Sequence, residues 1–172
     1  MKPLSFSFIL LFLLLLSCKK EKLPKPTQKG ANTFGCKIDG KIFIPKDVIT
    51  VPVIQGFSSR YSETTKELRL SAVEPPNEKE KRLQRDIVIN IHDLKIGDNK
   101  LDEISYARIV ISEEYQLDKY YGTNSTTGGI LNITRLDTNQ NIISGTFSFV
   151  AAPMQINSLN VHVTEGRFDI SY

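Results

Sequence analysis

The sequence has few of the residues that usually carry metal and nucleophile chemistry. It contains two histidines, two cysteines and no tryptophan. His92 and His162 each alternate with apolar residues in strand-like runs, and neither stands in a His-x-x-x-His or Glu-x-x-His spacing. A zinc site needs three or four protein ligands. We therefore predict no metal ion and no cofactor from these residues.

The sequence also lacks the motifs of common hydrolases and nucleotide-binding proteins. It has no Gly-x-Ser-x-Gly motif and no glycine-rich loop that could cradle a phosphate. Acids occur side by side at 102–103 and 113–114. Glycoside hydrolysis requires two carboxylates that face each other across a cleft. Adjacent residues of a strand point to opposite faces, so the two acids of either pair cannot be arranged in this way. A non-catalytic protein is the leading interpretation, and an enzyme with an unrecognised carboxylate site is the alternative.

Helix signals are scarce. The one helix candidate, residues 74–85, has Leu83 as its only large apolar side chain, so a helix there would have no face to bury. We predict a charged surface loop. Apolar and polar residues instead alternate at 67–73, 86–94 and 142–150, which is typical of half-buried antiparallel strands.

Turn residues between the alternating runs indicate the architecture. Asp39-Gly40 between two short runs predicts a β-hairpin, because a type I′ turn needs positive φ at both central residues. Further strands are expected at 106–112, 130–136, 159–164 and 167–172, with turns at 95–100 and 165–166. About nine or ten short strands without a helix predict an all-β fold, an antiparallel β-sandwich over residues 34–172. An open β-barrel is the alternative.

An apolar run near the N-terminus is too short to cross a bilayer. Lys2 precedes residues 6–16, which are apolar except for Ser7, whereas a spanning helix needs about 20 apolar residues. The run has the length of a secretory signal and ends in Leu-Leu-Ser-Cys, which resembles the bacterial lipoprotein box. By that resemblance residues 1–17 are a signal peptide and Cys18 carries the lipid. A plain signal peptide with an incidental cysteine is the alternative.

Charge is unevenly divided beyond the leader. Residues 18–33 carry five lysines, one acid and two prolines without an apolar period. We predict a flexible tether whose lysines lie against anionic head groups or act as an inert spacer. Residues 34–172 carry 16 basic and 18 acidic side chains. This balance argues against nucleic acid as a partner and leaves the membrane, through the N-terminal lipid, as the expected contact.

Two further features are interpreted as structural. With Cys18 acylated, Cys36 is a lone thiol among strand residues and is expected to be a small buried hydrophobe. Asp137, Asn139 and Asn141 place oxygen-bearing side chains at alternate positions, like the first half of a calcium loop. The glycine and glutamate that complete such a loop are missing, so we interpret the segment as a turn between strands.

Tyrosines give the candidate binding residues. Tyr115, Tyr120 and Tyr121 precede a loop at 122–129 that is rich in Thr, Ser, Asn and Gly. Loop tyrosines can stack on sugars or line protein interfaces. We predict a binding patch at these three residues, with ordinary packing at the end of a sheet as the alternative.

Four segments share a family resemblance. They are residues 34–41 (FGCKIDGK), 129–138 (GILNITRLDT), 143–149 (ISGTFSF) and 164–169 (TEGRFD). In this order they are similar to a group of Bacteroidota lipoproteins classed as a domain of unknown function, and the likeness covers roughly residues 15–172. It implies a secreted, lipidated, β-rich domain of the cell envelope, and it carries over no catalytic or binding residue.

These observations predict a protein anchored by lipid to a bacterial membrane. The outer membrane is the expected one, and its periplasmic or surface face stays open. The leading function is non-catalytic binding of a ligand or partner. An envelope hydrolase and a purely structural envelope protein are the alternatives.

Overall fold

The computed structural model describes residues 21–49, 53–77, 83–155 and 159–172. The predicted signal peptide and the lipid-bearing Cys18 lie outside these residues. The described chain forms eleven strands: β1 (Thr33–Ile38), β2 (Lys41–Phe43), β3 (Phe57–Ser62), β4 (Glu67–Asn77), β5 (Leu83–Ile91), β6 (Gly97–Leu101), β7 (Tyr106–Ser112), β8 (Lys119–Gly122), β9 (Gly129–Asp137), β10 (Ile142–Pro153) and β11 (Val161–Ser171).

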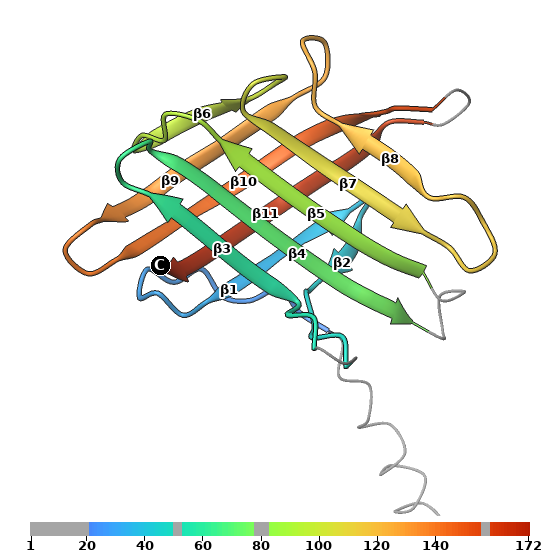
Figure 1. Cartoon of the computed structure of the whole chain (residues 1–172), viewed down its shortest axis with the longest axis horizontal. Helices are drawn as coiled ribbons and strands as arrows, with labels where there is room; N and C mark the ends of the chain where they lie inside the picture. The colour runs from blue at the N-terminus through green and yellow to red at the C-terminus, as the bar shows by residue number, and fades with distance from the viewer. Residues whose placement is uncertain (1–20, 50–52, 78–82, 156–158) are drawn as a thin grey trace, which may run out of the picture.

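The strands form two layers, and every pairing between them is antiparallel. The first layer has the order β2-β1-β11-β10-β9-β6, and the second has the order β3-β4-β5-β7-β8. In Figure 1 the strands of the second layer cross in front of those of the first. The end of β10 leaves the first layer and pairs with β8, where Ala152 faces Gly122 and Pro153 faces Tyr121. The eleven described strands are antiparallel, lie in two layers and do not close into a barrel, so the predicted antiparallel β-sandwich is confirmed.

The core lies between the layers and follows the alternation of the sequence. Inward-facing aliphatic side chains from the second layer are Leu68, Leu70, Ala72, Ile87, Ile89 and Ile91, all at most 1 % exposed. They meet an aromatic cluster from the first layer, in which the ring of Phe34 lies 5.1 Å from that of Phe147. Burying each of the leucine, isoleucine and phenylalanine side chains stabilises the fold by about 1.5–3 kcal/mol. The predicted apolar faces of residues 67–73, 86–94 and 142–150 are therefore the core faces.

The hairpin between β1 and β2 also forms as expected. Asp39 and Gly40 have φ values of 47° and 79°, the positive pair that a type I′ turn needs. The turn is tied to the first layer because the backbone N–H of His162 donates to Asp39 Oδ1 at 2.9 Å. In return, the N–H of Asp39 donates to the carbonyl of His162 at 2.9 Å.

Two expectations about connections are wrong. The predicted loop at 74–85 is largely strand, because β4 runs to Asn77 and β5 begins at Leu83. Glu74 and Arg85 face each other across these strands and pair, which lets charged residues lie between the layers. The predicted turn at 165–166 is part of the continuous strand β11.

The break in β11 is a bulge. Glu165 has a φ of 53°, and the pairing of β10 with β11 shifts register between Phe147 and Phe149. A Cβ on Gly166 would lie 2.4 Å from the ring of Phe147, so glycine is needed there for close packing rather than for a chain reversal.

Three strands were not expected: β3, β6 and β8. β6 occupies most of the predicted turn at 95–100, and β8 contains Tyr120 and Tyr121, which were predicted to lie in a loop. The two expected strands at 159–164 and 167–172 are instead one strand, β11, and the described chain forms eleven strands where nine or ten were expected. β3 and β6 are half polar and β8 has only four residues, so the alternation of apolar residues did not reveal them.

The segment before β1 is packed on the domain. Asp169 points away from the core and is 1 % exposed, because this segment covers it. Its carboxylate accepts hydrogen bonds from the backbone N–H groups of residues 29–31 at 2.9–3.1 Å and from the hydroxyls of Thr27 and Ser144 at 2.6 and 2.7 Å. This differs from the expected flexible tether over 18–33, since the part that the structure describes makes specific contacts.

Further contacts extend this packing toward the start of the described chain. Arg167 Nη1 donates to the carbonyl of Pro24 at 3.4 Å, and Arg135 Nη1 donates to the carbonyl of Gln28. At the first described residue, Glu21 forms an ion pair of 2.8 Å with Lys46, in the loop after β2. The segment therefore lies along the outer side of the first layer from residue 21 onward.

Candidate binding groove

The structure does not bring the three predicted tyrosines into one patch. Tyr115 is 94 % exposed and has a φ of 62° in the loop after β7. Tyr120 is 44 % exposed, whereas its neighbour Tyr121 is 5 % exposed. Consecutive residues of β8 point to opposite faces, so Tyr120 lies on the outer face of the second layer and Tyr121 points toward the core. Tyr121 nevertheless reaches a groove that sequence reasoning did not identify.

An open groove of about 890 Å³ lies where four segments meet at one end of the sandwich. We call it the end groove. It is lined by Asp39, Ile111, Lys119, Tyr121, Leu159, Asn160, Val161 and His162. These residues come from the β1–β2 turn, the end of β7, the start of β8 and the start of β11. The volume is in the range of sites that hold small ligands.

The end groove has an apolar floor and a polar rim. Tyr121 and Val161 are at most 5 % exposed and form buried parts of the lining. Asp39, Lys119 and His162 supply a carboxylate, an ammonium and an imidazole. Such a lining suits a ligand with an apolar body and polar groups, because the few polar side chains fix its orientation.

A second, smaller groove of about 610 Å³ adjoins the first. It is lined by Gln116, Leu117, Asp118, Lys119, Tyr120 and Gln155, and Lys119 belongs to both grooves. Leu117, in the second groove, and Leu159, in the first, are 91 and 89 % exposed, and Tyr115 in the same loop as Leu117 is 94 % exposed. Large apolar side chains this exposed beside adjoining grooves mark an interaction site more often than isolated exposed ones do.

Hydrogen bonds fix the lining of the second groove. Gln155 Oε1 accepts from the backbone N–H of Tyr120 at 3.0 Å, and Gln155 Nε2 donates to the carbonyl of Asp118 at 3.0 Å. The N–H of Met154 donates to the carbonyl of Tyr120 at 2.8 Å. The end of β10 therefore holds β8 and the loop before it in place, and the groove is formed before any ligand arrives.

One carboxylate next to the second groove has a perturbed pKa. Burial raises the pKa of Asp86, and the negative charge of Asp118 raises it further. Hydrogen bonds of 3.1 Å from Gln84 Nε2 to both carboxylate oxygens of Asp86 act in the opposite direction. Asp86 and Asp118 are thus two interacting acids of the kind that the hydrolase alternative would require.

The calcium-like segment is a turn whose carboxylate already has partners. Asp137 Oδ1 accepts from the backbone N–H groups of Asn139 and Gln140 at 3.1 and 3.0 Å, and Oδ2 accepts from Arg135 Nη2 at 2.7 Å. The hydrogen bond from Arg135 is the main cause that lowers the pKa of Asp137. Asn141 completes the turn with a φ of 54°. Within the described ranges, no group of three or more His, Cys, Asp or Glu side chains is placed to hold a metal ion.

Cys36 lies in the core, and its thiol is fully buried. Burial raises the pKa of the thiol strongly, and the nearby Arg85 guanidinium only partly opposes this effect. A thiol that stays protonated is a poor nucleophile. The expected structural role of Cys36 therefore agrees with its position.

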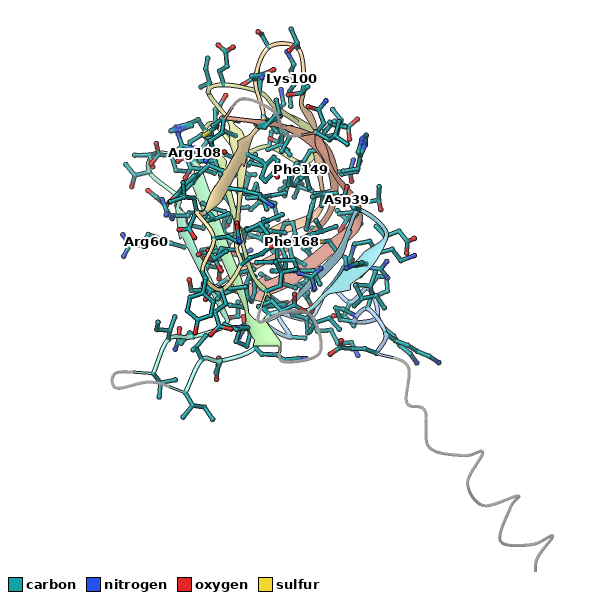
Figure 2. The ribbon with its side chains drawn as sticks, turned by 90° about the vertical axis from the view of Figure 1, so that its right-hand side faces the viewer. Asp39, Arg60, Lys100, Arg108, Phe149 and Phe168 are labelled. Atoms are coloured by element: carbon teal, nitrogen blue, oxygen red, sulfur yellow. The ribbon has the colours of Figure 1, made fainter. Side chains whose placement is uncertain are left out.

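The outer face of the second layer carries an arginine pair that the sequence did not reveal. Arg60 of β3 stands directly opposite Arg69 of β4. Arg108 lies further along this layer on β7, with its guanidinium 4.5 Å from the centre of the Tyr106 ring. Figure 2 shows Arg60 and Arg108 on the outer side of this layer. Because β3 was not predicted, Arg60 had no assigned neighbour and the pair could not be recognised.

Comparison of the chain with protein-family models, with curated proteins and with solved structures found no match. Among the residues that the structure describes, no helix is long and apolar enough to cross a membrane.

Proposed function

We propose that this chain is a lipid-anchored protein of the bacterial envelope that binds a ligand in the end groove without catalysing a reaction. The observation that carries the binding part is a groove with a buried apolar floor and the exposed Leu159 in its lining, next to a second groove lined by the exposed Leu117. A ligand that covers these exposed apolar side chains removes them from water, and this removal favours binding.

The side chains at the rim of the end groove limit which classes of ligand can bind there. Asp39 and Lys119 offer charges of opposite sign, and Tyr121 offers an aromatic surface. An amphipathic ligand with both donors and acceptors fits this rim better than a purely anionic one. Short peptide segments and glycans both have this character.

The anchoring part of the proposal rests on the leader. An apolar run that ends in Leu-Leu-Ser-Cys, followed by a lysine-rich segment, supports acylation of Cys18. The resemblance to Bacteroidota lipoproteins points the same way. Replacing the thiol by Cys18→Ala should abolish metabolic labelling with a fatty acid, and labelling that persists in this variant would show that the anchor is misassigned.

Binding is tested by screening a peptide and glycan panel against a soluble chain of residues 19–172. A true ligand should raise the melting temperature of this chain and should not be consumed. Lys119→Glu and Leu159→Ser should weaken binding at least about tenfold each, because each removes a contact at the groove. Lys100→Glu is the matched control, since Lys100 is exposed and lies outside both grooves. Equal loss in the control would contradict this site.

The pair Asp86 and Asp118 keeps a hydrolase as the second candidate. A hydrolase should turn over a chromogenic glycoside or ester and should lose turnover in Asp118→Asn with its melting temperature unchanged. Asp118 lines the second groove, so a substrate there could reach it. Turnover that survives this substitution would remove the carboxylate pair as its source, and absence of both turnover and binding would favour a structural protein.

A further inference from the structure

Apolar side chains project from the loop between β2 and β3. Ile49, Val53 and Ile54 are 92, 57 and 51 % exposed. Val48 and Ile54 bridge the two arms of this loop, with N–H···O distances of 2.9 and 3.1 Å in the two directions. The described ends of the loop are thus held as a narrow hairpin, and its apolar side chains have no contact with the core that would shield them.

The base of the same loop is fixed to the domain. The backbone N–H of Gly56 donates to Asp47 Oδ1 at 2.8 Å, and the N–H of Val73 donates to the carbonyl of Gly56 at 2.7 Å. The N–H of Lys46 donates to the carbonyl of Val73 at 3.0 Å. A Cβ on Gly56 would lie 2.3 Å from the carbonyl carbon of Lys46, so only glycine permits this approach. These contacts fix where the two described arms of the loop leave the domain.

The start of the described chain lies at the same end of the molecule. Glu21 is ion-paired to Lys46 at the base of the loop, with a distance of 2.8 Å. In both figures, the described start of the chain and the β2–β3 loop lie at the lower end, and Figure 2 shows one below each layer. Cys18 precedes Glu21 by three residues, which span at most about 11 Å of extended chain.

The chain that follows Glu21 is bound closely to the domain. Residues 29–31 and Thr27 are hydrogen-bonded to the buried Asp169, and Pro24 accepts from Arg167. A lipid on Cys18 would consequently hold this end of the sandwich close to the bilayer instead of letting the domain move freely on a long tether.

We infer that Ile49, Val53 and Ile54 insert into the bilayer interface as a second membrane contact beside the acyl chains of Cys18. The inference rests on the proposed lipid anchor and adds an orientation to it. Two contacts, one below each layer, fix which end of the sandwich faces the lipid. Lys22 and Lys46 line one groove at the base of the same loop, and lysines near a bilayer surface favour anionic head groups.

A membrane accounts for the modest size of this patch better than a protein partner does. A loop of three apolar side chains binds a bilayer weakly by itself. An anchor that already holds the loop at the surface makes its insertion intramolecular, so that little apolar area suffices. A stable protein interface would need roughly 800 Å² on each partner, far more than three side chains supply.

The test uses the lipidated chain with a fluorescent probe on Val53→Cys. The probe reacts at this position alone, because Cys36 is buried and the sulfur of Cys18 is blocked by the lipid. Thr64→Cys, in the exposed turn between β3 and β4, is the matched control at the far end of β3. Each protein is placed in vesicles of phosphatidylethanolamine with a minority of phosphatidylglycerol, some of it carrying a nitroxide quencher.

The probe at position 53 should be quenched several-fold more strongly than the probe at position 64. Equal quenching overturns the inference, and so does a signal at position 53 that depends on protein concentration and not on the quencher, which would indicate a second copy of the chain. Fatty-acid labelling of the same sample reports the anchor separately. A labelled protein without quenching at position 53 would therefore refute the membrane contact and leave the proposed anchor intact.

A second variant separates the apolar side chains from mere proximity to the lipid. Ile49→Ser with Ile54→Ser, in the chain with the probe at position 53, removes two exposed side chains without touching the core. Thermal unfolding should be unchanged, whereas the inserted fraction should fall on the order of tenfold. Quenching that persists at its original level overturns the inference, because the anchor alone would then place the loop.

Discussion

The carboxylate of Asp169 accepts a hydrogen bond of 2.9 Å from the backbone N–H of Gly30, which is 139 residues away in the sequence. The contact joins the segment after the predicted lipid site to the last strand of the sandwich. Asp169 is buried and accepts five hydrogen bonds, four from residues 27–31 and one from Ser144. It is therefore the residue that holds this segment on the sandwich.

Asp169 should therefore make the free energy of unfolding depend on pH in the acidic range. Burial alone would raise the pKa of its carboxyl, but the hydrogen bonds from Thr27, Lys29, Ser144 and Ala31 lower it from 3.8 to about 2. A carboxyl whose pKa is lower in the folded state stabilises that state above its unfolded pKa. The contribution, about 2 kcal/mol, is lost as the pH falls from about 4 to about 2.

Urea unfolding of the wild type and of Asp169→Asn across this pH range measures that contribution. The variant should be less stable by about 2–3 kcal/mol at pH 7, because an amide nitrogen replaces one accepting oxygen. The difference should shrink toward pH 2. Asp98→Asn, at an exposed aspartate, is the control and should show no comparable change. A difference that stays constant with pH would contradict the role of Asp169.

Removing the segment that Asp169 holds, residues 19–32, should also lower the stability of the fold. A chain that begins at residue 33 lacks the Thr27 hydroxyl and the amides of residues 29–31, so the buried Asp169 carboxylate keeps only Ser144 as a partner. Compared with a chain that begins at residue 19, it should lose about 2–3 kcal/mol of unfolding free energy. In Asp169→Ala the same truncation should cost much less, because the carboxylate is already gone. Equal costs in both backgrounds would show that the segment stabilises the fold by another route.

Cys36 should be unreactive as long as the protein is folded. Its thiol is fully buried, and burial raises its pKa, so almost no thiolate is present at neutral pH. Maleimide labelling of the chain of residues 19–172 should be slow without denaturant and fast in urea. Val53→Cys, with its exposed thiol, should label at once and serves as the positive control. Rapid labelling of Cys36 under native conditions would mean that the core opens locally.

Much of the fold could be predicted because apolar alternation reports the core directly. The runs around Leu70, Ile89 and Phe147 were assigned to the correct faces, and Asp39-Gly40 formed the expected hairpin. The failures have physical causes. For example, β6 was predicted as a turn because its sequence is polar. Its central residue, Asn99, is nevertheless buried, and its side chain forms hydrogen bonds with the backbone of Lys95 and Leu131.

The candidate site was less accessible to sequence reasoning. The end groove joins Asp39, Lys119 and His162, which are far apart in the sequence and meet only through the pairing of β1 with β11 and of β8 with β10. The predicted tyrosine patch lies in the same region as the grooves. However, Tyr120 and Tyr121 lie on a strand, β8, and therefore point to opposite faces. The prediction of a loop at these residues could not show this difference in direction.

The arginine pair on the outer face should respond to a change of charge. Arg60 and Arg69 are direct cross-strand partners, and like charges in this position are destabilising. Arg69→Glu should raise the unfolding free energy by about 0.5 kcal/mol at low salt, and the gain should fade near 1 M salt because the pair is exposed. Lys41→Glu changes the net charge equally without facing an arginine. A similar gain in this control would assign the effect to net charge and not to the pair.

The ion pair of Glu74 and Arg85 links the two layers and should give the sharpest pH signature. Arg85 Nε donates to Glu74 Oε2 at 2.6 Å, and Arg85 Nη2 reaches the carbonyl of Ile42 in the first layer at 3.3 Å. The side chains of Arg85 and Glu74 are 7 and 11 % exposed. Burial raises the pKa of Glu74, and the charge of Arg85 opposes that rise. Without Arg85, the pKa of Glu74 in the folded state should rise further.

Arg85→Met should cost about 3–5 kcal/mol at pH 8, because it leaves a buried carboxylate without its cation. A carboxyl whose pKa is raised in the folded state contributes stability below its unfolded pKa and loses it as the pH rises. The deficit of Arg85→Met should therefore be smaller near pH 4, where Glu74 takes up a proton, and should grow toward pH 8. Combining it with Glu74→Gln should remove this pH dependence, since the carboxyl that takes up the proton is then gone. A deficit that is equal at both pH values would mean that the lost contacts of Arg85 with Phe43 and Ile42, and not the unpaired charge of Glu74, set the cost.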